Sequence, residues 1–145
     1  MKNSKARNTS GDDWITPIKT YEELDREFKF DYDPCPYKAD FDSLELKDWP
    51  GKSIFVNPPY SRKLKEAFIK KSYEESAKGK LVVLLLPVST STTIFQDLIL
   101  KNAAEIRFIR GRIKFMQKDS NGNLYTPGVG QHDSMLVIFD GRKKI

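Results

Sequence analysis

Apolar positions in this chain fall into short continuous runs and into longer segments with helical spacing. Residues 53–56, 81–86 and 135–139 are almost entirely apolar, which predicts strands. The run at 81–86 is bounded by Lys80 and Pro87 and is typical of a strand buried on both faces of a sheet. Three further strands are predicted, at residues 28–33, 105–109 and 111–115.

Between these runs, apolar side chains recur with the spacing of helices. Residues 20–23 form a capping-box pattern that predicts the start of a first helix. Ser61 is expected to cap a second helix, which ends just before Gly79. A second capping box at residues 93–96 predicts a third helix that runs to about Asn102.

Strands therefore alternate with helices over most of the chain. This order predicts an α/β fold with a mostly parallel sheet between helical layers. Residues 37–50 lack periodicity and are interpreted as a loop with one turn of helix at about 43–46. The polar residues 118–130, with Asn121 and Gly122, predict an antiparallel hairpin or flap near the C-terminus.

Length, composition and charge narrow the class of protein. The chain has 145 residues and is 39% hydrophobic, which suits one domain with a buried core. Its net charge is +5, and basic residues gather at 62–71, 107–118 and 142–144, which favours a polyanionic partner such as nucleic acid. Residues 1–12 are polar and basic and are expected to form a disordered tail before a domain at 13–145.

Cysteine content and hydropathy exclude several other classes. The single cysteine, Cys35, excludes an internal disulfide and a multi-cysteine metal site, so no metal is expected. One free thiol fits a reducing cytosol. No apolar run reaches about 18 residues and no secretory signal pattern is present, so we expect a cytoplasmic protein without a membrane span.

The most informative motif is Asn57-Pro58-Pro59-Tyr60, directly after the strand at 53–56. Two consecutive prolines fix the backbone and prevent the strand or a helix from continuing, so this tip must project from the sheet edge. The Asn57 side chain offers hydrogen-bond donors and an acceptor, and Tyr60 offers a flat aromatic face. This arrangement suits recognition of a planar amine. Because ligands of such sheets bind at the carboxyl ends of strands, residues 31–36 are expected beside it.

These motifs occur in an order that resembles the small phage-type DNA N6-adenine methyltransferases, which use S-adenosylmethionine. The likeness covers residues 13–139 and includes a final apolar strand. The residues that carry it are Asp13, Trp14, Thr16, Pro17, Asp33, Pro34, Asp42, Leu44, Trp49, Asn57, Pro58, Pro59, Tyr60, Ser61, Leu85, Leu86, Pro87, Gly111, Arg112 and Phe115. The resemblance implies a trimmed Rossmann-like methyltransferase fold and a phage or prophage gene expressed in a bacterial cell.

The resemblance also implies roles for individual residues. The S-adenosylmethionine site would include Thr16, Pro17, Asp33 and Pro34 at the methionine end and Asp42 near the ribose or adenine. Trp14 and Trp49 either frame this pocket or pack in the core. Asn57 and Pro58 would accept the two amine hydrogens, with Pro59 holding the turn and Tyr60 stacking on the extruded base. DNA would contact Arg62, Arg112, Lys114 and Lys118, the last two near the flap.

Four alternatives remain at this point. The motif recognises a planar amine, so cytosine N4 or a protein glutamine are alternative substrates. Pro34-Cys35 is similar to the nucleophile pair of cytosine-C5 methyltransferases, but the accompanying Glu-Asn-Val element is missing. Residues 33–36 contain no glycine where methyltransferases generally have a glycine-rich turn, so a non-catalytic nucleic-acid-binding module is a further alternative. Finally, Ser89 to Thr93 either bind phosphates at a helix start or serve as helix caps, and His132 is interpreted as a solvated loop residue rather than a catalytic one.

Overall fold

The computed structural model describes residues 13–127 and 132–142, and the predicted tail at 1–12 lies outside this part. Its helices are α1 (Ile18–Phe28), the 3-10 helix η1 (Ser43–Glu45), α2 (Arg62–Ser76), the π-helix η2 (Ile94–Ile99) and α3 (Leu100–Asn102). Its strands are β1 (Ser53–Val56), β2 (Leu81–Pro87), β3 (Glu105–Phe108), β4 (Gln117–Lys118), β5 (Leu124–Tyr125) and β6 (Ser134–Asp140). Among the described residues, no helix is both long and apolar enough to span a bilayer.

The central sheet has four strands in the order β1-β2-β6-β3. β1 pairs with β2 in parallel, whereas β6 is antiparallel to both β2 and β3. Three strands therefore share one direction and β6 alone is reversed. The α/β class is confirmed, but the expected mostly parallel pairing is corrected to a mixed sheet, because the reversed strand lies inside the sheet rather than at its edge.

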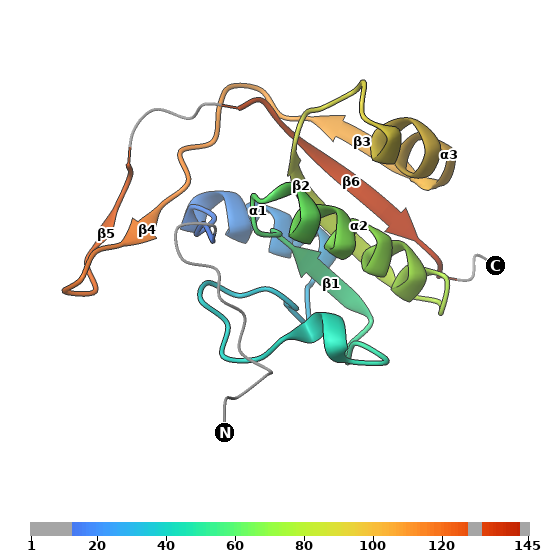
Figure 1. Ribbon diagram of the computed structural model, residues 1–145, viewed down its shortest axis with the longest axis horizontal. Helices are drawn as coiled ribbons and strands as arrows, with labels where there is room; N and C mark the ends of the chain where they lie inside the picture. Colours follow the sequence, from blue (N-terminus) through green and yellow to red (C-terminus); the bar gives the residue numbers. More distant parts are fainter. Residues whose placement is uncertain (1–12, 128–131, 143–145) are drawn as a thin grey trace.

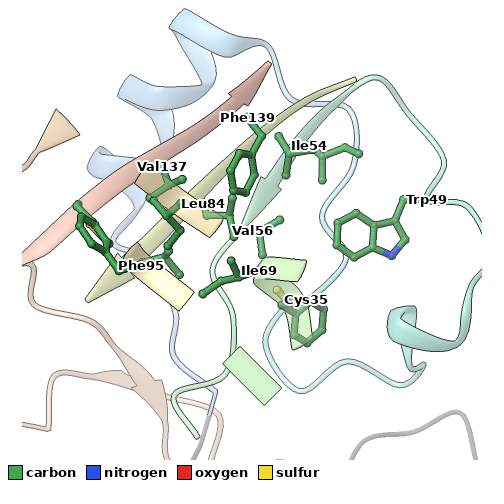
Figure 2. Close-up of a cluster of buried hydrophobic side chains, with 14 residues drawn as sticks. Cys35, Trp49, Ile54, Val56, Ile69, Leu84, Phe95, Val137 and Phe139 are labelled. Atoms are coloured by element: carbon green, nitrogen blue, oxygen red, sulfur yellow. The ribbon is translucent and has the colours of Figure 1, made fainter. Parts of the chain in front are cut away.

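Both faces of the sheet are covered, which gives three layers (Figure 1). On one face, α2 and η2 pack over a cluster that contains Val56, Leu84 and Phe139, part of which Figure 2 shows. On the other face, Tyr21, Leu24 and Phe28 of α1 pack against a second cluster built around Phe55 and Val83. β2 is buried along its whole apolar run, as expected for a strand covered on both faces.

The second helix begins as predicted, with Ser61 as the N-cap residue of α2 but without a side-chain capping bond, whereas the first helix begins earlier than predicted. α1 starts at Ile18, with Pro17 as its N-cap and no side-chain capping bond, so the capping box at 20–23 is wrong. Proline holds φ at −54° there and has no N–H that needs a partner, which makes it an adequate N-cap residue. Near η2, the Thr92 hydroxyl, rather than Thr93, accepts the backbone N–H of Phe95 at 3.3 Å.

Two predicted strands are also corrected. Within residues 28–33, Phe28 ends α1 and Lys29 takes a left-handed conformation with φ of 51°, so only Tyr32 pairs in parallel with Ile54 of β1. Residues 111–115 form an irregular segment on the α1 side of the sheet. The predicted hairpin is confirmed as β4 and β5, which project away from the sheet (Figure 1).

A buried carboxylate joins the end of α2 to the loop before β1. Glu75 is fully buried and accepts the backbone N–H of Trp49 at 2.8 Å. It also accepts hydrogen bonds from the ammonium groups of Lys78 at 2.5 Å and Lys80 at 2.7 Å. Burial by itself raises the pKa of this carboxyl, but the two lysines and the Trp49 amide outweigh it and lower the pKa to about 2.

Candidate active site

The candidate site is built around Asn57, the first residue after β1. Its side-chain amide nitrogen donates two hydrogen bonds, to the backbone carbonyl of Trp14 at 3.0 Å and to the hydroxyl of Thr16 at 3.0 Å. Two residues more than forty positions earlier in the chain are thereby brought onto the motif predicted to be catalytic.

These bonds determine which way the Asn57 amide points. A backbone carbonyl only accepts hydrogen bonds, so the NH2 group of Asn57 must face Trp14 and the side-chain oxygen must face away from it. Within the described part of the chain, no hydrogen bond ends on that oxygen. An amide with both N–H groups engaged and its oxygen turned outward is arranged to accept a hydrogen from a ligand.

The segment at 33–36 lies at the same edge of the sheet, as the sequence predicted. The thiol of Cys35 donates to the backbone carbonyl of Asn57, with a sulfur-to-oxygen distance of 3.2 Å. The Asp33 carboxylate accepts the backbone N–H of Cys35 at 2.9 Å, which stabilises the turn at residues 33–35. The two segments therefore contact each other through Cys35, and Figure 2 shows this side chain at the border of the core cluster.

Pro34 and Asp42 are connected to each other through Ser43. Pro34 is buried, and its carbonyl accepts the Ser43 hydroxyl at 2.5 Å. Asp42 caps η1 by accepting the Leu44 N–H at 3.0 Å. The loop with Asp42 is thus tied to residues 33–36 through its neighbour Ser43. Trp49, whose role was left open, belongs to the core: it is 1% exposed, and its indole N–H donates to Ser43.

Tyr60 lies at the centre of an aromatic cluster. The ring of Trp14 stacks on it with centroids 5.4 Å apart, and the rings of Phe115 and His132 meet it edge-on at 6.0 and 5.9 Å. Burial raises the pKa of the Tyr60 phenol to about 12, so the ring is neutral at physiological pH. Trp14 therefore belongs to the site, and it occupies one face of the tyrosine predicted to stack on a base.

The N-terminal segment is in turn held by the chain that enters the hairpin. Ile15 and Met116 exchange two backbone hydrogen bonds, of 2.8 and 3.0 Å. The Gln117 side chain adds a bond to the carbonyl of Asp13 at 3.2 Å. Residues 13–17 thus form a bridge between the Asn57 motif and the base of β4.

Of the four residues predicted to contact DNA, Arg112 and Lys114 line one groove, and Arg62 and Lys118 lie outside it. Arg62 begins α2 and pairs with Glu66 at 3.3 Å, and Arg112 pairs with Asp133 at 3.4 Å. Lys114 is exposed just before Phe115, and Lys118 lies in β4. Lys114 and Lys118 lie on either side of Phe115 in the chain, whereas Arg62 is the first residue of α2, two residues after Tyr60.

Sequence reasoning missed three features of this site. It predicted neither the contact of the Cys35 thiol with Asn57 nor the contacts of the His132 and Phe115 rings with Tyr60. All three contacts join segments far apart in sequence, and no local pattern reports such pairs. Among the described residues, no group of three or more histidine, cysteine or acidic side chains is arranged to hold a metal ion.

Comparison with known proteins gives one family for this site. The family model for DNA N-6-adenine-methyltransferase (Dam) matches residues 3–144. The chain is also similar to the DNA N-6-adenine-methyltransferase of Haemophilus phage HP1 (strain HP1c1), with 31% identity over 153 aligned positions that cover 97% of this chain and 85% of the phage protein. No solved structure gave a significant match. The protein belongs to the DNA N-6-adenine-methyltransferase (Dam) family.

Proposed function

We propose that this protein transfers a methyl group from S-adenosylmethionine to N6 of adenine at a particular sequence in DNA, with Asn57 and Pro58 at the reacting amine. The observation that carries the proposal is the orientation of the Asn57 amide, whose oxygen faces away from Trp14 and Thr16. Membership in the family supports adenine as the base and DNA as the polymer.

The chemistry explains why oxygens are needed at this position. The lone pair of an exocyclic amine is delocalised into the aromatic ring, so adenine N6 is a weak nucleophile. The side-chain oxygen of Asn57 accepts one N6 hydrogen and the backbone carbonyl of Pro58 accepts the other, which localises the lone pair on nitrogen. The same two dipoles stabilise the positive charge that develops on nitrogen. Much of the rate then comes from positioning the two reactants.

The charge and aromatic character of the residues around Asn57 suit the binding of S-adenosylmethionine. When bound, this cofactor supplies an electrophilic methyl group on a sulfonium sulfur. Its cationic and aromatic parts suit the carboxylate of Asp33 and the ring of Trp14. Thr16, Pro17 and Pro34 complete the proposed pocket, and Asp42, held near Pro34 through Ser43, is proposed for the ribose or adenine side.

Tyr60 is proposed to stack on the adenine after it leaves the duplex. One face of its ring carries Trp14 in this structure, so the base would use the opposite face or replace the indole. Arg62, Arg112, Lys114 and Lys118 are proposed as phosphate contacts around this point, because positive side chains supply most non-specific affinity for DNA.

The test is transfer of labelled methyl from S-adenosylmethionine to mixed-sequence DNA, followed by analysis of the nucleosides. We expect label in N6-methyladenine, and we expect Asn57→Ala to abolish it while leaving the melting temperature near that of the wild type. Asn102→Ala, at the exposed end of α3, is the matched control and should retain activity.

Label confined to cytosine or to protein would exclude adenine as the substrate, and absence of cofactor binding would favour a non-catalytic module. Sequencing of the methylated sites then tests whether methylation is site-specific.

A further inference from the structure

A groove on the α1 side of the molecule adjoins the candidate active site. One wall is the start of α1, with Pro17, Lys19 and Thr20, and the other wall is the irregular segment at 109–114. Leu136 of β6 lies at its floor, and its volume is about 450 Å³. We refer to it as the basic groove.

The lining of the groove is strongly cationic. Four basic side chains contribute to it, namely Lys19, Arg110, Arg112 and Lys114, against one carboxylate, Glu23. Arg112 is paired with Asp133, but within the part of the chain that the structure describes no ion pair involves the other three cations. Lys19, Arg110 and Lys114 are all exposed. Uncompensated positive charges converging on one concave surface favour a polyanion.

Both walls of the groove continue directly into residues that contact the proposed catalytic motif. Pro17 follows Thr16, whose hydroxyl accepts a hydrogen bond from Asn57. Lys114 precedes Phe115, whose ring lies against Tyr60. The groove therefore adjoins the residues proposed to hold the extruded base.

We propose that the basic groove binds phosphates of the DNA strand next to the target nucleotide, with Lys19 and Arg110 as phosphate contacts alongside Arg112 and Lys114. This inference rests on the proposed function and extends it, because neither Lys19 nor Arg110 belongs to a recognised motif. The groove has an apolar floor and basic walls, so it reads the charge of the backbone rather than the identity of a base.

The experiment compares two full-length variants with equal changes in charge. The groove variant is Lys19→Gln, Arg110→Gln and Lys114→Gln, and the control is Lys47→Gln, Lys52→Gln and Lys101→Gln, three exposed lysines elsewhere on the surface. Binding of a fluorescent DNA duplex, without cofactor, is measured over a range of salt concentrations. Each lost phosphate contact reduces the slope of log affinity against log salt by about 0.9.

For the groove variant we expect the dissociation constant at low salt to rise at least tenfold and the slope to fall by about 2 to 3, with little change in the control. Equal effects in the two variants, or none in the groove variant, would overturn the proposal. If the triple substitution lowers the melting temperature, the three single variants decide the matter, each with an expected slope change of about 0.9.

The outcome is separable from that of the proposed function. If the groove assignment fails but the function is right, the single variants Lys19→Gln and Arg110→Gln, which change the two residues that this inference adds, still methylate adenine with an unchanged KM for DNA. If the function fails but the groove binds phosphates, the wild type produces no N6-methyladenine and the salt dependence still differs between the two variants. If both are right, the groove variant keeps its kcat at saturating DNA and has a raised KM.

Discussion

The amide nitrogen of Asn57 and the hydroxyl oxygen of Thr16 are 3.0 Å apart, and this bond links the strand-end motif to the segment that leads into α1. Together with the Trp14 carbonyl, it occupies both N–H groups of the amide. The proposed hydrogen acceptor is thus fixed by residues outside its own motif. Rigid support of this kind keeps a reacting group in its productive orientation.

Replacing Thr16 by valine should lower turnover without abolishing it. The substitution keeps the shape of the side chain but removes the oxygen, which leaves the Asn57 amide with one partner instead of two. A neutral hydrogen bond contributes about 1 kcal/mol, so kcat should fall roughly fivefold to tenfold. The measurement is steady-state methyl transfer with saturating DNA and cofactor.

The conservative variant Thr16→Ser provides the control, since its hydroxyl restores the bond and should restore kcat. The affinity for S-adenosylmethionine, measured separately by calorimetry, distinguishes the two roles open to Thr16. A positioning role changes kcat more than cofactor affinity. Weaker cofactor binding with an unchanged kcat would show that Thr16 lines the cofactor pocket and does not orient Asn57.

The ring of Tyr60, rather than its hydroxyl, is expected to matter for activity. Because burial raises its pKa to about 12, the phenol does not ionise below about pH 10, and Tyr60→Phe should keep both the rate and its pH dependence. Tyr60→Ala should lose about 1 to 3 kcal/mol of base stacking, which appears as a lower kcat/KM for DNA. A phenylalanine variant as impaired as the alanine variant would contradict stacking as the role of this residue.

The single cysteine gives a direct test of covalent chemistry. The Cys35 thiol donates to the Asn57 carbonyl, and a serine hydroxyl can donate in the same way. Cys35→Ser is therefore expected to retain most of the methyl-transfer activity, whereas a nucleophilic cysteine would lose nearly all of it on this change. Complete inactivation of a folded Cys35→Ser variant, together with label at cytosine C5, would support cytosine-C5 methylation with Cys35 as the nucleophile.

The sequence was sufficient for the features that depend on local pattern. The buried strand at 81–86, the hairpin around Asn121 and Gly122, and the turn of helix near residue 43 all follow from neighbouring residues. The direction of β6 could not be predicted in this way. An apolar strand has the same pattern in both directions, and its pairing between β2 and β3 depends on the whole topology.

In the candidate site, too, some residues could be identified from local pattern and others only from the fold. Asn57 to Tyr60 could be identified because two prolines after an apolar strand are a strong local signal. The partners that orient Asn57 and surround Tyr60 come from residues 14–16, 35, 115 and 132, which only the fold brings together. The predicted first helix starts three residues late, because the capping-box pattern indicates Thr20 as the N-cap residue whereas the N-cap residue in the structure is Pro17.

Glu75 makes the stability of the fold depend on pH. Its pKa is about 2 in the folded protein and near 4.5 when unperturbed, which corresponds to about 3 kcal/mol of stability. Because the folded state holds the carboxylate ionised, this stabilisation is fully present above about pH 4.5 and is lost as the pH falls through about 2. The contribution arises from two lysine ammonium groups and one backbone N–H that converge on a fully buried side chain.

Substituting glutamine for Glu75 should therefore lower the free energy of unfolding at neutral pH by about 2 to 4 kcal/mol, because Lys78 and Lys80 lose their common counter-charge. Denaturant unfolding at pH 7 measures this loss, and Glu74→Gln, one residue away and exposed, serves as the control with an expected change within about 0.5 kcal/mol.

Repeating the unfolding measurement at decreasing pH adds a second criterion. The wild type should lose stability faster than Glu75→Gln between about pH 5 and pH 2, so the two curves converge in acid. Parallel curves over this range would mean that Glu75 titrates normally and that the lysine contacts do not stabilise its charge.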